Sequence, residues 1–187
     1  MSKSIVISAP SGAGKSSIVK FLLDEVDDIK FSVSACNRKK RAGEQEGENY
    51  FFLSTKEFKA RIEGGFFLEW EEVYPNKFYG TLAASVNKIW EEDKHVIFDI
   101  DVVGGLNLKN KFQNDCLAVF ISPPSFSVLK ERLVNRGTEQ DNDLKMRLAK
   151  VKEELTFKDK FDHVIINENF SDACERVLEL VKDFINQ

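Results

Sequence analysis

The sequence predicts an α/β fold in which helices flank a doubly wound parallel sheet, with a mixed α+β insert in the chain. Short apolar segments alternate with amphipathic helical patterns in residues 1–32 and 94–187, and this alternation is typical of parallel strands joined by crossover helices. Residues 33–93 have a mixed, irregular pattern instead. We therefore expect a discontinuous core domain, 1–32 and 94–187, and an inserted subdomain, 33–93.

Length, charge and cysteine content narrow the class of protein. A chain of 187 residues is long enough for one folding unit with excursions. The net charge of −4 gives no general attraction to nucleic acid or membranes, so we expect neither partner, and an anionic ligand must be held by local positive charge. Ile5–Ile7 is too short for a signal peptide or a membrane span. Cys36, Cys116 and Cys174 lie far apart, which favours reduced thiols and a cytoplasmic protein.

The first half of the chain alternates strand and helix patterns. Ser54 and Glu57 form a capping box that begins a helix ending at Gly64–Gly65. The segment Tyr74–Gly80 is expected to be a loop. The other expected elements are strands at Ser4–Ser8, Phe31–Ala35, Tyr50–Leu53 and Phe66–Trp70, and helices at Lys15–Val26 and Ala83–Glu92.

The second half predicts the remaining strands and helices of the core. Ligands of such sheets bind at the carboxyl ends of the strands, where Ser8, Asp101 and Ser122 are expected to emerge. Ser171 or Asp172 is expected to cap the final helix. The expected elements are strands at His95–Asp101, Cys116–Ser122 and His163–Asn167, and helices at Val103–Phe112, from the cap Ser125 through Asn135, over Leu144–Leu155 and over Ala173–Phe184.

A phosphate-binding loop follows the first strand. Backbone N–H groups and the positive end of the following helix would converge on phosphate oxygens, which favours this interpretation over an ordinary strand-to-helix turn. Ala9 stands where the pattern has glycine, a substitution that fails only if position 9 requires a positive φ. The loop residues expected to bind a nucleoside triphosphate are Ala9, Pro10, Ser11, Gly12, Ala13, Gly14, Lys15, Ser16 and Ser17.

Further motifs extend over nearly the whole chain. On them the sequence resembles the guanylate kinases, which implies a P-loop kinase fold with an inserted GMP-binding subdomain and a mobile lid at about residues 125–148. The chain departs from the family pattern at Ala9, Cys36, Asn37 and Val103. The motifs are Phe31-Ser-Val-Ser34, Arg38, Arg41, Glu44, Gly47, Tyr50, Phe67-Leu-Glu69-Trp70, Phe78-Tyr79-Gly80-Thr81, Asp99-Ile-Asp101, Pro123-Pro124-Ser125, Arg136-Gly137-Thr138 and Arg147-Leu148.

The resemblance implies a site for GMP in the insert. Hydroxyls of Ser34 and Thr81 would serve guanine O6, while carboxylates of Glu69 and Asp101 would accept from N1–H and N2–H₂, a polarity that adenine does not match. Without the resemblance, the two carboxylates could be ordinary salt-bridge partners and the arginines a solvated charge run. The residues implied to hold GMP are Ser34, Arg38, Arg41, Glu44, Tyr50, Glu69, Tyr79, Thr81 and Asp101.

The resemblance also implies an ATP site with Mg²⁺ as cofactor. Ser16 would ligate Mg²⁺, and Asp99 would act through a metal-bound water or else orient Ser16 or Lys15. Asn167 corresponds to a residue near the family's adenine pocket. The residues implied to act on the transferred phosphoryl group are Lys15, Arg38 and the lid arginines Arg132, Arg136 and Arg147.

The implied activity is reversible phosphoryl transfer from ATP to GMP, and also to dGMP, with ADP and GDP as products. One alternative is a catalytically inactive guanylate-kinase-like interaction module, although the intact Gly14, Lys15 and Ser16 argue against it. Another alternative is a kinase of similar fold with a different phosphorylated acceptor. Four side chains that match the donors and acceptors of guanine argue against this alternative: Ser34, Glu69, Thr81 and Asp101.

Overall fold

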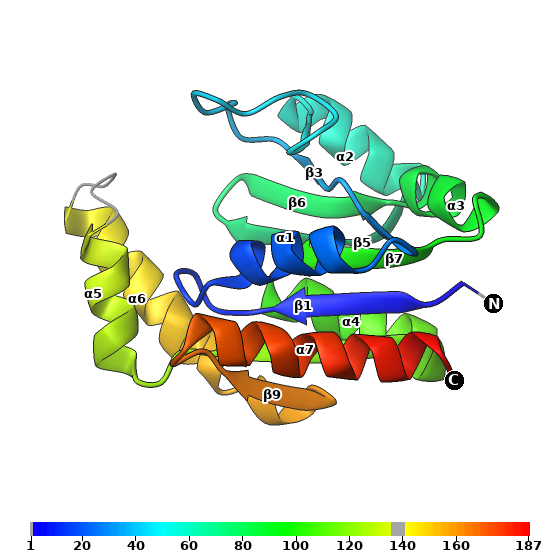
Figure 1. Cartoon of the computed structure of the whole chain (residues 1–187). Coiled ribbons are helices and arrows are strands. Elements are labelled where there is room, and N and C mark those ends of the chain that lie inside the picture. Colours follow the sequence, from blue (N-terminus) through cyan, green and yellow to red (C-terminus); the bar gives the residue numbers. More distant parts are fainter. Residues whose placement is uncertain (1, 136–140) are drawn as a thin grey trace.

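The structure is a computed structural model that describes residues 2–135 and 141–187. Figure 1 shows the chain as a parallel sheet with helices on both faces and a second sheet beside it. The strands are β1 Ser4–Ser8, β2 Ile29–Phe31, β3 Ala35–Cys36, β4 Phe51–Phe52, β5 Phe67–Tyr74, β6 Lys77–Leu82, β7 His95–Ile100, β8 Cys116–Ser122 and β9 His163–Ile166. The α-helices are α1 Lys15–Glu25, α2 Thr55–Glu63, α3 Ala83–Glu91, α4 Val102–Phe112, α5 Phe126–Asn135, α6 Asp141–Leu155 and α7 Phe170–Ile185.

The first sheet is parallel, as the sequence predicts. Within the described ranges its strand order is β2-β7-β1-β8-β9. The central strand β1 pairs in parallel with β7 on one side and β8 on the other, so that Ser8 lies opposite Ile100 and Phe120. The carboxyl ends of β1, β7 and β8 therefore meet at one edge of the sheet, which confirms where the sequence expects the strand ends to emerge.

Helices cover the two faces of this sheet. Ile5 and Ile7 point into a buried core shared with α1 and α7, and Val6 points into the opposite core, shared with α3 and α4. Figure 1 shows α1 and α7 on one side of β1 and α4 on the other. This burial on both faces explains why β1 is an uninterrupted apolar run rather than an alternating one.

The second sheet has the order β4-β3-β6-β5 among the described residues, and it lies above the first sheet in Figure 1. Helix α2 packs on it through Phe58, whose ring stacks on Phe67 at 4.5 Å and lies 5.7 Å from the ring of Phe78. The capping box predicted for α2 is confirmed: Ser54 accepts from Glu57 N at 3.2 Å, and Glu57 accepts from Ser54 N at 2.8 Å.

Two expectations for the middle of the chain are wrong. The single strand expected at Phe31–Ala35 is two strands in different sheets. Ser32 N donates to the carbonyl oxygen of Ile97 in the first sheet. The carbonyl oxygen of Ser34 accepts from Phe51 N at the second sheet. The loop expected at Tyr74–Gly80 is mostly strand β6, joined to β5 by a tight turn in which Asn76 has a positive φ of 58°. Local alternation does not reveal which sheet a strand joins, and the turn is shorter than the loop we expected.

Helix boundaries in the second half also differ from expectation. Asn169, not Ser171 or Asp172, caps α7 by accepting from Ser171 N at 2.9 Å. Asp101, expected as the last residue of the strand His95–Asp101, lies beyond the end of β7 and caps α4. Ser125 accepts from Val128 N at 3.2 Å, as expected at the start of α5.

Residues 136–140 of the predicted lid, about 125–148, lie outside the described residues, and Arg136 is one of them. No helix in the described portion of the chain is long and apolar enough to cross a lipid bilayer.

Candidate active site

One cavity of about 300 Å³ lies at the carboxyl edge of the parallel sheet, between the phosphate loop, the second sheet and α6. It joins most of the residues that the sequence assigns to two separate ligands. The lining residues are Ala9, Pro10, Ser11, Gly12, Gly14, Lys15, Ser16, Ser17, Ser34, Tyr50, Glu69, Val73, Tyr74, Tyr79, Gly80, Asp99, Ile100, Asp101, Arg147, Lys150, Val151 and Glu154.

The phosphate loop connects β1 to α1 at one end of this cavity. Gly12 and Gly14 have φ values of 90° and 97°, which residues with a side chain rarely adopt. Ala9 has no positive φ and is buried, so the alanine fits the position without strain. Gly14 is the N-cap of α1 and no side chain in the described residues caps that helix end, which leaves its first N–H groups available to an anion.

Lys15, Ser16 and Asp99 form a polar group at the floor of the cavity. Ser16 donates to an Asp99 oxygen at 2.6 Å, and Lys15 Nζ forms an ion pair with the other Asp99 oxygen. Neighbouring hydroxyl and carboxylate oxygens are hard ligands of the kind Mg²⁺ prefers. Within residues 2–135 and 141–187, no group of three or more His, Cys, Asp or Glu side chains could hold a metal ion.

Asn167 supports the phosphate loop from behind. Its side-chain amide is buried and donates to Ala13 O at 2.7 Å. A Cβ built on Gly14 would lie only 2.4 Å from the same nitrogen, so the amide packs directly against the loop. The resemblance associates Asn167 with adenine, whereas its contacts in the structure position the backbone that would bind phosphate.

We expect Asn167→Ala to weaken binding of ATP and of inorganic tripolyphosphate alike, by about 3- to 10-fold, because one buried hydrogen bond that shapes the loop is lost. Calorimetric titration of both ligands measures this, with the exposed Asn186→Ala as a control. A variant that loses affinity for ATP but binds tripolyphosphate normally would indicate that Asn167 acts on adenine instead.

The far end of the cavity contains a buried carboxylate. Glu69 on β5 lies opposite Thr81 on β6, and the Thr81 hydroxyl donates to Glu69 at 2.6 Å. Glu69 is only 8% exposed. This burial raises the pKa of Glu69 to about 7, against the opposing effect of the Thr81 hydrogen bond. Because Thr81 gives its one proton to Glu69, it acts here by orienting that carboxylate.

Asp101 stands beside Glu69. One of its oxygens accepts from Val103 N and Gly104 N, both at 3.0 Å, and so caps α4. Ser8 donates to the carbonyl oxygens of Ile100 and Asp101 at 3.0 and 3.1 Å. These hydrogen bonds join the end of β7 to the residue that precedes the phosphate loop.

Gly104 makes room for Glu69. A Cβ at Gly104 would lie 2.8 Å from Glu69 Oε2 and from Ile100 Cδ1, closer than such atoms pack. We expect Gly104→Ala to displace the carboxylate and raise the KM of the acceptor nucleotide by about tenfold, as overpacking of this size costs 1–3 kcal/mol. The KM of ATP should stay within about twofold, since the clash is with Glu69 and not with the phosphate loop.

Steady-state kinetics with each substrate varied in turn would measure this effect. Gly105→Ala is the matched comparison, because a Cβ there would meet Ser8 Oγ rather than Glu69. Equal effects of the two substitutions on the acceptor KM would contradict the assignment to Gly104.

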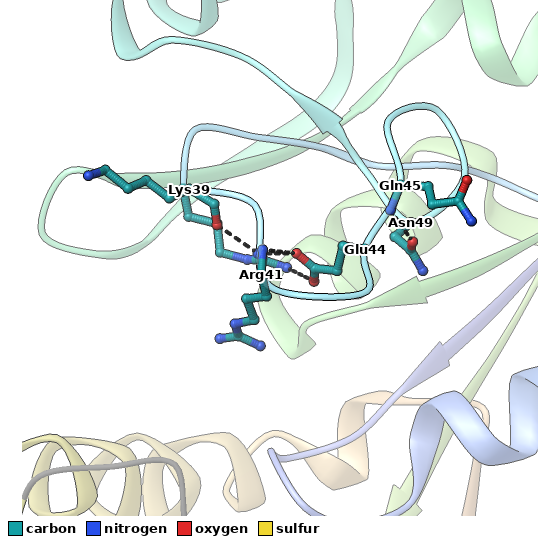
Figure 2. Close-up of polar contacts among 6 residues, drawn as sticks. Lys39, Arg41, Glu44, Gln45 and Asn49 are labelled. Carbon is teal, nitrogen blue, oxygen red and sulfur yellow. Dashed lines mark hydrogen bonds and ion pairs between the residues drawn. The ribbon is translucent and has the colours of Figure 1, made fainter.

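Arg38 is not among the residues that line the cavity, but it packs on Tyr50, which is. Its guanidinium donates to both Glu44 oxygens, one at 2.7 Å, and lies 4.8 Å from the ring centroid of Tyr50. Glu44 also accepts from Arg41 N at 2.8 Å, while Figure 2 shows the Arg41 side chain extending away from Glu44. The Arg38 hydrogen bonds lower the pKa of Glu44 to about 2. In this structure Glu44 therefore positions the guanidinium of Arg38.

Of the remaining predicted residues, Tyr50, Tyr79 and Arg147 line the cavity, whereas Arg41 and Arg132 are not among its lining residues. Tyr50 and Tyr79 meet edge to face at 6.0 Å, and burial raises the pKa of both phenols. Arg147 lines the cavity from α6, and Arg132 on α5 donates to the Asn167 carbonyl at 3.4 Å. One cavity thus brings together Lys15 and Ser16 of the loop with the tyrosines predicted for the second site.

Sequence reasoning missed the rest of the α6 face. Lys150 donates to Val73 O at 3.2 Å, lies 3.9 Å from Glu71 and 5.3 Å from the ring centroid of Tyr74, so it joins α6 to the second sheet. Glu154 lines the cavity one turn further along. Helical spacing from Arg147 would have found both, since positions three and seven residues on share its face.

A phosphate loop on a parallel sheet, with Tyr50, Tyr79 and two carboxylates across one cavity from Lys15, is the arrangement of a phosphate-loop kinase that acts on a small phosphorylated acceptor. The family model described as guanylate kinase matches residues 1–184. The chain belongs to the guanylate kinase family.

Individual relatives agree with this placement. The chain is 44% identical to a guanylate kinase of Bacteroides thetaiotaomicron, over 99% of this chain and 91% of that protein. It is 45% identical to a guanylate kinase of Thermotoga maritima, over 95% of this chain and 84% of that protein. A crystal structure of guanylate kinase from Anaplasma phagocytophilum superposes with a TM-score of 0.78 at 26% identity, covering 97% and 85% of the two chains.

Proposed function

We propose that this protein transfers the γ-phosphoryl group of ATP to GMP, giving ADP and GDP. The observation that carries the proposal is one continuous cavity lined by Lys15 and Ser16 as well as by the carboxylates Glu69 and Asp101. A triphosphate at one end and a guanine base at the other would bring the two phosphates together between them. The guanylate kinases among its relatives support the same reaction.

The acceptor end suits GMP. Glu69 and Asp101 would accept from guanine N1–H and N2–H₂, and the Ser34 hydroxyl would donate to O6. Thr81 would take part by holding Glu69. Arg38, fixed by Glu44, would meet the GMP phosphate together with Arg41, Tyr50 and Tyr79, as guanidinium forks and phenolic hydroxyls suit phosphate oxygens.

Transfer requires no protein nucleophile. A phosphate oxygen of GMP attacks the γ-phosphorus of ATP. At the same time the bond between the γ-phosphorus and the β–γ bridging oxygen breaks, and ADP leaves. Lys15 would exchange Asp99 for the transferred oxygens, and Arg132, Arg136 and Arg147 would add positive charge, with Arg136 outside the described residues. Mg²⁺, held by Ser16 and through water by Asp99, would neutralise phosphate charge.

Three further proposals accompany the reaction. The division into a core, 1–32 and 94–187, and a GMP-binding insert, 33–93, would let the two substrate sites approach on closure, with residues 125–148 as the lid.

The buried thiols of Cys36, Cys116 and Cys174 suit a reducing cytoplasm. The intact geometry at Gly12, Gly14 and Lys15 favours an enzyme over an inactive interaction module.

A coupled assay of ADP release tests the reaction, with Mg·ATP fixed and GMP, dGMP, AMP, UMP or ribose 5-phosphate as acceptor. We expect turnover with the guanine nucleotides and little with the others, because AMP would set an acceptor against Glu69 and Asp101. Absence of GMP-dependent ADP release would refute the proposal.

A further inference from the structure

Glu154 on α6 is a buried carboxylate that lacks a donor. It is 8% exposed and faces the cavity. Within the part of the chain that the structure describes, no side-chain hydrogen bond acts on its carboxylate, whose oxygens are open to the cavity and not sealed in the core. A charged group so deeply buried is costly unless something pairs with it. Burial accordingly raises the pKa of Glu154 to about 7.

The groups around Glu154 do not supply that partner. Lys150, one turn earlier on the helix, already donates to Val73 O and lies beside Glu71. Lys15 is paired with Asp99. The described residues hold no cluster of three or more acidic, His or Cys groups suited to a metal ion. The missing donors are therefore most simply those of a ligand in the cavity.

The chemistry of that ligand follows from what a carboxylate accepts. An ionised carboxylate has acceptor sites only, so it requires O–H or N–H groups and would repel phosphate oxygens. A nucleoside monophosphate offers such donors on its base and its sugar. In the proposed GMP complex the N–H donors of the base are accepted by Glu69 and Asp101. The ribose hydroxyls are then the donors available to Glu154.

The position of Glu154 agrees with a sugar between base and phosphate. It lines the same cavity as Asp101 at the guanine end and Lys15 at the phosphate end, and the charges of both act on it. We propose, on the basis of the proposed GMP kinase function, that Glu154 accepts a hydrogen bond from a ribose hydroxyl of GMP and so favours the ribonucleotide over its deoxy form. Glu154 is then a specificity-determining residue that contacts the substrate.

Binding of GMP, 2′-deoxy-GMP and 3′-deoxy-GMP to the full-length protein tests this proposal by calorimetry, supported by the KM of each with saturating Mg·ATP. We expect the wild type to bind GMP about tenfold more tightly than the analogue that lacks the contacted hydroxyl, as hydrogen bonds to charged groups contribute on this scale. Glu154→Ala should reduce that ratio to within about twofold of one. Glu154→Gln, which keeps an acceptor without the charge, should give an intermediate ratio.

Glu153→Ala is the matched control, since it removes the same charge from an exposed neighbouring position of α6 and should keep the wild-type ratio. A merely structural role of Glu154 would change stability but not the ratio of GMP to deoxy-GMP. If Glu154→Ala fails to fold, the ratio for the near-isosteric Glu154→Gln decides.

Two results would overturn the proposal. One is a wild type that binds GMP and both deoxy analogues equally. The other is a Glu154→Ala variant that keeps the wild-type ratio, including the case in which it changes discrimination between ATP and deoxy-ATP instead. Absence of any GMP binding or turnover by the wild type would refute the proposed kinase function itself, which separates the two failures.

Discussion

Replacing Lys15 with alanine is expected to lower kcat by about 100- to 1,000-fold while the Kd for GMP stays within about twofold. Lys15 lies in the phosphate loop beside Ser16 and Asp99, and its ammonium would stabilise charge on the transferred phosphoryl group. The predicted GMP residues Ser34, Glu69 and Tyr79 belong to the other end of the cavity. The substitution should therefore remove chemistry without removing the acceptor site.

Coupled ADP-release kinetics and calorimetric titration with GMP measure the two quantities separately. Lys20→Ala is the control, because Lys20 lies on the exposed face of the same helix and pairs only with Asp24 among the described residues. A loss of GMP affinity as large as the loss of kcat would contradict the division of the cavity into two ends.

The parallel sheet could be predicted because its strands are short apolar runs such as Ser4–Ser8, buried on both faces and separated by helical patterns. The helix cap at Ser54 could be predicted because a capping box is a local signal. The hairpin of β5 and β6 could not, because its pairing depends on contacts between strands and its turn is too short to stand out.

In the candidate site, too, features that are local in the sequence could be predicted, and features that depend on contacts between distant segments could not. The phosphate loop is contiguous, so Gly12, Gly14 and Lys15 could be found together in the sequence. The roles of Thr81 and Asn167 could not, since each depends on a hydrogen bond across distant segments, to Glu69 and to Ala13. Propensity and spacing name such residues, but only the assembled fold shows which atom each one faces.

Substituting Glu69 with glutamine is expected to raise the KM of GMP by about 10- to 100-fold and to reduce the preference for GMP over AMP, while the KM of ATP changes little. The amide keeps the shape of the carboxylate but loses its charge and can turn an N–H₂ group toward guanine N1–H. Glu63→Gln, exposed at the end of α2, is the matched control. An unchanged preference for GMP over AMP would refute the role of Glu69.

The pH dependence of GMP binding gives a second, independent test of Glu69. Burial raises its pKa to about 7 in the free protein, so below that pH the group is largely protonated. Guanine N1–H requires the ionised form, so binding must release a proton, and the affinity should fall by up to about tenfold for each pH unit below 7. Above pH 7 the carboxylate is already ionised and this contribution becomes constant.

Calorimetry between about pH 5.5 and 8.5, in buffers of different ionisation enthalpy, measures both the affinity and the proton release. The phosphate of GMP has a second pKa of about 6 and adds its own dependence, which Glu69→Gln retains. The difference between wild type and Glu69→Gln therefore isolates the carboxylate. Parallel curves for the two proteins would mean that Glu69 does not change its protonation when GMP binds, and guanine recognition would have to depend on Asp101.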